Sequence, residues 1–163
     1  TLDQAVNYHE AFKGMPQMPI HCDYHPGNLK FEDEKVIGIF DFDWFKVDYR
    51  LFDVALALVY FTSIWDDQAA GLRPDKFTLF LSAYNKTCLR LSHINPLSKQ
   101  ERRHLIPMLS IANLYVLNWD LVDFYDTPNQ NDDEYYSYIN HNIGLVRWIA
   151  LHEDKLKRWV NKS

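Results

Sequence analysis

Apolar residues recur at helical spacing along most of this chain. Between residues 50 and 63 they repeat on one helical face with no Gly or Pro to interrupt it, at Leu51, Val54, Ala55, Leu58, Val59 and Phe61. This pattern predicts a nearly buried helix. Further helices are predicted over residues 1–12, 75–91, 98–125 and 132–152, the last continuing or kinking through residue 159.

Local signals indicate where two of these helices begin. Ser98 and Glu101 match a capping box, in which the Ser98 hydroxyl accepts an early backbone N–H and Glu101 reaches back to the N–H of Ser98. Asp75 is the predicted cap of the helix over residues 75–91. Pro107 lacks the N–H that a mid-helix position needs, so we predict a kink there.

A different pattern precedes the buried helix. Residues 18–21 are predicted to form a short strand. Residues 29–31 and 35–40 should form a hairpin, because the charged turn at residues 32–34 separates two apolar runs. The predicted fold class is α+β, mainly α, with a small β-hairpin in an otherwise helical single domain over residues 1–163.

Composition and charge narrow the class of protein. Hydrophobic residues make up 47% and charged residues 24% of the 163 positions, which is typical of a globular domain and argues against disorder. The formal net charge of −5 argues against a large nucleic-acid interface, which needs clustered basic residues. We interpret the short basic runs at residues 99–104 and 155–158 as solvated helix faces.

Cysteine usage and the absence of targeting signals bear on the compartment. Two cysteines, Cys22 and Cys88, are too few for a disulfide framework. We find no secretory signal and no apolar run that we expect to cross a bilayer. These features favour a reducing, cytoplasmic setting. Because Thr1 already lies in a helical pattern, we interpret the chain as part of a longer protein.

The stretch from Ile20 to Asn28 carries the strongest chemical signal. Phosphoryl transfer to an alcohol needs a carboxylate to orient and deprotonate the hydroxyl, together with oxygen ligands for Mg²⁺. Asp23, with Asn28 five residues later, suits a curled loop that turns the carboxylate toward the acceptor and the amide oxygen toward the metal. Asp41 follows the second strand of the predicted hairpin, whose first strand starts at Asn28. Both candidate metal ligands are therefore expected at neighbouring hairpin ends.

This order of residues, H-x-D-x-x-x-x-N followed by a short hairpin and hydrophobic-Asp-Phe, resembles the aminoglycoside phosphotransferase and choline kinase superfamily, a branch of the protein-kinase-like fold. The resemblance implies the helical carboxyl-terminal lobe of a kinase that uses ATP and Mg²⁺. It makes Asp23 the catalytic base or orienter and His21 the residue that orients the loop. It makes Asn28 and Asp41 the Mg²⁺ ligands.

A second segment extends the resemblance. Residues 48–55 look like the family's Asp-Pro-x-x-x-Asp-Leu-Ala segment, which implies structural roles for Asp48 and for Asp53, the latter packed under the catalytic loop. The run at residues 95–98 before the capped helix is similar to the substrate lobe of type II homoserine kinases and spore-coat kinases.

Several features depart from the family pattern. Cys22 stands where the family usually has Gly, and Tyr49 replaces a common Pro. Asp43 stands where protein kinases have the Gly of Asp-Phe-Gly, and it is either an extra metal-side or substrate-side carboxylate or a solvated strand-end residue. No Gly-rich loop and strand Lys precede His21. We therefore expect the nucleotide-clamping lobe to be missing from this sequence and the isolated chain to be a poor kinase.

Aromatic and acidic side chains are the candidates for the acceptor side. Trp44 and Trp119 are candidate walls of an aromatic pocket, which suits an amine through cation–π attraction. Asp120, Asp123 and Asp126 recur every three residues on the long helix. They either attract a cationic acceptor, such as an amino alcohol or amino sugar, or form a solvated acidic face.

The same residues have other interpretations. His21, Cys22 and His25 are potential zinc ligands, and an Asx-rich turn would explain the polar loop without chemistry. The strand before Asp41 is similar to the nucleophile loop of haloacid-dehalogenase phosphatases, although the Thr that this motif needs is missing. A non-catalytic kinase-like scaffold would keep the same fold. A protein kinase is disfavoured, since no Ala-Pro-Glu segment follows.

Overall fold

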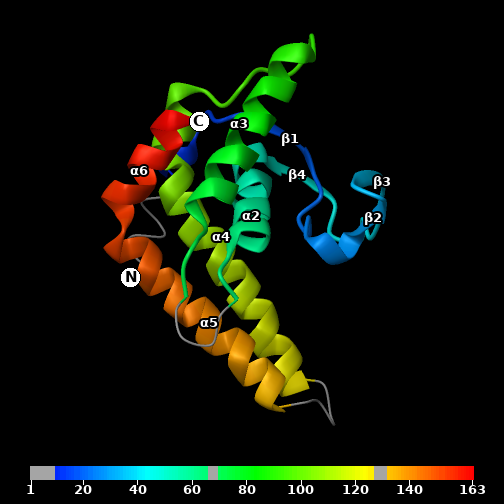
Figure 1. Cartoon of the computed structure of the whole chain (residues 1–163), viewed down its shortest axis with the longest axis vertical. Coiled ribbons are helices and arrows are strands. Elements are labelled where there is room, and N and C mark those ends of the chain that lie inside the picture. Colours follow the sequence, from blue (N-terminus) through cyan, green and yellow to red (C-terminus); the bar gives the residue numbers. More distant parts are fainter. Residues whose placement is uncertain (1–9, 66–69, 127–131) are drawn as a thin grey trace.

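The computed structural model describes residues 10–65, 70–126 and 132–163. Its elements are β1 (Gln17–Ile20), β2 (Leu29–Glu32), β3 (Lys35–Ile39), β4 (Lys46–Tyr49), α2 (Arg50–Thr62), α3 (Pro74–Arg90), α4 (Lys99–Asp126), α5 (Asp132–Leu151) and α6 (Glu153–Lys162) (Figure 1). The fold class is α+β, mainly α, as predicted. The helix predicted over residues 1–12 lies outside the described residues except for residues 10–12, which are helical.

The strands form two separate antiparallel pairs. β2 and β3 make the predicted hairpin, with Leu29 opposite Ile39. β1 pairs with β4, a strand that the sequence pattern did not predict, with Ile20 opposite Lys46. Since β1 ends where the polar loop begins and β4 leads directly into α2, this pairing joins the two ends of the segment that carries the loop and the hairpin. Figure 1 shows this segment projecting to one side of the helices.

The helices form the body of the protein. α4 packs against both α2 and α5, and α6 packs against α3. The side chains at the centre of the core are at most 1% exposed; they include Leu51, Leu58, Phe77, Leu105, Leu109, Leu145, Ile149 and Leu156. Burial of each such side chain contributes about 1.5–3 kcal/mol to folding.

A buried ion pair connects the start of α2 with the start of α4. Arg50 Nε and Nη2 donate to Oε1 and Oε2 of Glu101 at 2.7 and 2.8 Å. The same guanidinium donates to the backbone carbonyls of Asn95 and Pro96 at 2.6 and 3.1 Å. The capping box is confirmed, because Glu101 Oε2 accepts the N–H of Ser98 at 2.8 Å and the Ser98 hydroxyl accepts the N–H of Glu101 at 3.2 Å.

The predicted cap of α3 is wrong. The helix begins at Pro74, Arg73 is the capping residue without a side-chain hydrogen bond, and Asp75 lies inside the first turn. Proline favours the first helical position because its fixed φ suits the helix and it has no N–H to leave unpaired.

Helix α4 runs unbroken through Pro107. Among the described residues it is the one helix that is long and apolar enough, by length and composition alone, to cross a membrane. The sequence pattern led us to expect no such run. Much of its apolar surface packs in the protein core, because the side chains of Leu105, Leu109, Ala112 and Val116 are buried there.

Candidate active site

The ring of His21 connects the loop of residues 21–28, the predicted catalytic loop, to the segment after β3. Its Nε2 lies 2.8 Å from the carbonyl oxygen of Phe40, and its Nδ1 accepts the backbone N–H of Asp23 at 3.3 Å. Together these contacts require the tautomer that carries its proton on Nε2. The ring also packs against Phe42, with 4.7 Å between the ring centroids. His21 therefore holds the backbone of Asp23 against the segment that bears Asp41.

The side chain of Asn28 turns back onto Asp23. Asn28 Nδ2 donates to Oδ2 of Asp23 at 2.8 Å and to its backbone oxygen at 2.9 Å. His25 Nε2 lies 3.5 Å from the same Oδ2. Because Nδ2 is used in this way, the amide oxygen of Asn28 is the atom left to bind a cation.

Backbone pairing places Asp41 next to Asn28. The N–H of Phe40 donates to the carbonyl of Asn28 at 2.9 Å, so Asp41 directly follows the partner of Asn28. Asp41 has a φ of 57°, in the left-handed region that Asp tolerates better than most residues, and it is exposed. An amide oxygen and a carboxylate are the hard donors that Mg²⁺ binds, with waters and phosphate oxygens completing its shell. The two side chains therefore fit a magnesium ion in their chemistry.

Asp53 on α2 supports the start of the catalytic loop. Its Oδ2 accepts the N–H of His21 at 3.1 Å, and its Oδ1 accepts the N–H of Cys22 at 2.9 Å. The backbone of Cys22 has a φ of 66°, a conformation that glycine adopts without strain. The loop thus bends sharply at the residue that Asp53 holds.

Cys22 is a buried thiol. Its side chain is 1% exposed, and burial raises the pKa of the thiol to about 11. The three ranges of described residues also contain no cluster of three or more His, Cys, Asp or Glu side chains that could hold a metal ion. The zinc interpretation therefore finds no support in the geometry.

A cavity of about 380 Å³ opens beside Asp23, between the catalytic loop, α2 and α4. Its lining residues are Asp23, Trp44, Tyr60, Tyr115, Val116, Trp119, Asp120 and Asp123. The rings of Trp44 and Trp119 pack together, with 4.6 Å between their centroids. The structure thus brings Trp44, Trp119, Asp120 and Asp123 next to Asp23, and their role toward an acceptor stays a prediction.

Two other acidic candidates do not line this cavity. Asp43 is exposed and does not line the cavity. Asp48 lies in β4, where its Oδ1 accepts the N–H of Tyr49 at 2.7 Å and its Oδ2 lies 3.0 Å from Lys46 Nζ. The contacts of Asp48 are therefore local to the strand.

The cavity is acidic. Three carboxylates line it, whereas no Lys or Arg does so within the described part of the chain. Burial raises the pKa of Asp120, a hydrogen bond from Asn142 opposes this rise, and the negative charge of Asp123 adds to it. Burial also raises the pKa of Tyr60, and the charges of Asp23 and Asp120 add to that rise. Such a field favours a cationic ligand.

Sequence reasoning missed Tyr60 and Tyr115, which line the cavity, and Asn142, which does not line it but contacts Asp120. Tyr60 lies within an apolar helical run, so its hydroxyl gave no separate signal. Tyr115 precedes Trp119 by four residues, a spacing that places both on one helical face and could have indicated it. Asn142 belongs to another helix and is recognised only from its contact with Asp120.

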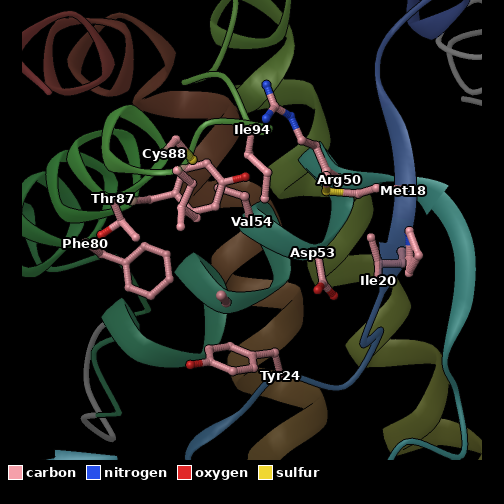
Figure 2. Close-up of a pocket in the computed structure, with 14 residues that line it drawn as sticks. Met18, Ile20, Tyr24, Arg50, Asp53, Val54, Phe80, Thr87, Cys88 and Ile94 are labelled. Atoms are coloured by element: carbon pink, nitrogen blue, oxygen red, sulfur yellow. The ribbon is translucent and has the colours of Figure 1, made fainter.

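A second cavity, of about 340 Å³, lies between β1, α2 and α3. Its walls are mainly apolar. Figure 2 shows Asp53 projecting from α2 beside Met18 and Ile20 of β1. The two cavities share no lining residue, and Asp53, whose carboxylate oxygens both accept hydrogen bonds from the loop, lines only this one.

Comparisons with known proteins identify the family of this chain. The phosphotransferase enzyme family matches residues 1–84, a range that includes the catalytic loop, the hairpin and α2. A homoserine kinase from Xanthobacter autotrophicus is 32% identical over 117 residues, which cover 71% of this chain and 33% of that protein. A homoserine kinase from Ralstonia pickettii is 32% identical over 122 residues, which cover 70% of this chain and 33% of that protein.

A longer match comes from Methylobacillus flagellatus, whose homoserine kinase is 27% identical over 168 residues, covering 98% of this chain and 48% of that protein. The chain thus spans between a third and a half of the length of these relatives. The family match covers more than half of the chain and contains the whole loop and hairpin arrangement. This chain belongs to the phosphotransferase enzyme family.

Proposed function

We propose that this chain is the carboxyl-terminal lobe of an ATP-dependent kinase that moves the γ-phosphate to a hydroxyl group of a small, amine-bearing molecule. One observation carries the proposal. The carboxylate of Asp23 is bonded to Asn28 on one side and lines the acidic, aromatic cavity on the other. Family membership and the names of the relatives support the same reaction class.

Each residue of the site has a role in this proposal. Asp23 orients the acceptor hydroxyl and takes its proton as the hydroxyl oxygen attacks the γ-phosphorus and ADP leaves. His21 and Asp53 hold the loop that carries Asp23. Asn28 and Asp41 would hold Mg²⁺, which when bound neutralises charge on the transferred phosphoryl group.

The charges of the cavity favour an amine on the acceptor. Asp120 and Asp123 offer carboxylates, and Trp44 and Trp119 offer ring faces, to an ammonium group. The carboxylate of an amino acid such as homoserine would need a cationic partner from elsewhere in the protein. Amino alcohols and amino sugars have no such carboxylate and would need no cationic partner.

The nucleotide would be held jointly with a second lobe that contacts the hairpin side of this chain. Apolar side chains concentrated between residues 31 and 47 are at least 44% exposed; they are Phe31, Val36, Ile37, Ile39, Phe40, Phe42, Trp44, Phe45 and Val47. An exposed apolar surface of this kind is typical of a contact with another protein part.

With ATP as donor and both cysteines free and buried, we place the enzyme in the cytoplasm.

Steady-state phosphotransfer by the full-length natural protein tests the reaction, with choline, ethanolamine, glucosamine and homoserine as acceptors. We expect Asp23→Asn to lower kcat about 10²–10⁴-fold, because the hydroxyl loses its base. Asp75→Asn, an exposed change on α3, is the matched control. Wild-type kcat in Asp23→Asn would refute the proposal, and failure of the full-length protein to bind Mg-ATP would favour a non-catalytic scaffold.

The same assay tests the lobe assignment. We expect the 163-residue chain to turn over ATP far more slowly than the full-length protein, because phosphate positioning is lost. Equal rates would show that no second lobe is needed.

A further inference from the structure

The carboxylate of Asp120 accepts a hydrogen bond from a second helix, α5. Asn142 of α5 donates from Nδ2 to Asp120 Oδ2 at 2.6 Å, and Asn142 is 1% exposed. Because a carboxylate only accepts hydrogen bonds, the amide must present its N–H₂ to Asp120. A hydrogen bond to an ionised group is stronger than one between neutral groups.

Asn142 is itself held in place by the helix that carries Asp120. Its backbone carbonyl accepts from Asn113 Nδ2 at 2.7 Å, and Asn113 is fully buried. Asn113 precedes Asp120 by roughly two helical turns, so both project from one face of α4. The network thus begins and ends on α4 and passes through α5, and it holds the backbone of Asn142 against α4.

We propose that Asn142 is a positioning residue for acceptor recognition: it fixes Oδ2 of Asp120 and directs the remaining oxygen, Oδ1, toward the amine of the acceptor. This inference rests on the proposed function. Asn142 does not line the cavity, so in this role it acts only through Asp120.

The pairing of Asn142 with Asp120 carries an electrostatic cost that packing of α4 against α5 alone would not require. Asp120 is half-buried, lines the same cavity as Asp23, and lies one helical turn before Asp123 on α4. Burying a charge beside like charges is unfavourable, and a neutral amide pair would join α4 to α5 more cheaply. The hydrogen bond from Asn142 favours the ionised carboxylate, which is the form that binds an ammonium group.

The test compares acceptors that differ only in the amine, in the full-length natural protein. Homoserine is paired with 4-hydroxybutyrate, and ethanolamine with ethanol. We expect Asn142→Ala to raise KM for the amine-bearing acceptor roughly tenfold, the equivalent of one charge-assisted hydrogen bond, with kcat and the KM for ATP within about twofold. The KM for the amine-free acceptor should not change. Asn140→Ala, an exposed change on the same helix, is the control.

A double-mutant cycle separates positioning from a structural role. In an Asp120→Asn background, Asn142→Ala should change the preference for the amine-bearing acceptor by less than about twofold, because the residues act through one contact. Additive effects, or equal losses for both members of an acceptor pair, would overturn the inference. If Asn142→Ala does not fold, Asn142→Ser is measured in its place. A wild-type protein that phosphorylates none of these acceptors would instead refute the proposed function.

Discussion

The side-chain amide of Asn28 donates to the carboxylate of Asp23 at 2.8 Å. The proposed metal ligand and the proposed base are therefore not independent, because one amide fixes the carboxylate with its nitrogen and offers its oxygen to the cation. Any change at Asn28 should alter both functions together.

We accordingly expect Asn28→Ala to lower kcat about 10²-fold and to raise the magnesium concentration needed for half-maximal activity. Asn28→Asp keeps an oxygen ligand but places a second carboxylate beside Asp23, so it should retain magnesium binding better than Asn28→Ala while still losing kcat. Magnesium titrations of the full-length protein provide the measurement. An unchanged magnesium dependence in Asn28→Ala would remove Asn28 from the metal site.

We expect Asp53 to stabilise the folded protein, although it does not line the Asp23 cavity. Asp53→Ala leaves the N–H groups of His21 and Cys22 without their acceptor, and we expect a loss of about 3 kcal/mol in the free energy of unfolding. Asp53→Asn keeps one oxygen and should lose less. Urea denaturation of both variants, with Asp75→Ala as the surface control, measures the difference. Equal stability of Asp53→Ala and the control would contradict the support role.

The Arg50–Glu101 pair predicts a pH dependence of stability. Burial alone would raise the pKa of Glu101, but hydrogen bonds from Arg50 and Ser98 outweigh it and lower that pKa. Because the folded pKa lies below the unfolded value of about 4.3, the contribution is present at neutral pH and is lost as pH falls through the folded pKa.

Glu101→Gln should therefore destabilise the protein by about 3 kcal/mol near neutral pH, since Arg50 loses its charged partner. The gap between wild type and variant should begin to shrink as the pH falls below about 4.3, where the unfolded carboxyl takes up a proton, and should be lost as the pH falls through the lower folded pKa. Denaturation curves across this range measure it. A gap that does not depend on pH would mean that the charge of Glu101 contributes nothing.

Cys22 should be unreactive in the folded protein despite lying between His21 and Asp23. Its thiol is buried, and its raised pKa of about 11 keeps it protonated at neutral pH. Iodoacetamide should label it slowly in the native protein and rapidly in urea, as read by mass spectrometry with Cys22→Ser as the reference. Fast native labelling at Cys22 would contradict the burial of this side chain.

The features that could be predicted were those with local causes. The spacing of apolar residues predicted α2, α4 and α5. The three-residue separation of Ser98 and Glu101 predicted their reciprocal hydrogen bonds at the start of α4. β4 was missed because its polar–apolar alternation is only four residues long, and the strand forms where β1 supplies a partner.

The sequence by itself determined the order of the elements and the spacing of Asp23, Asn28 and Asp41, because a loop and a hairpin relate residues that are near neighbours in the chain. On the sequence alone, Asp120, Asp123 and Asp126 were equivalent candidates for the acceptor side, because they recur every three residues on one helix. Only the tertiary structure decided that the first two line the cavity with Asp23 and that Asn142 holds Asp120, because the packing of α4 against α2 and α5 sets which helical face meets the loop. Side chains on different elements meet through packing, which sequence spacing does not encode.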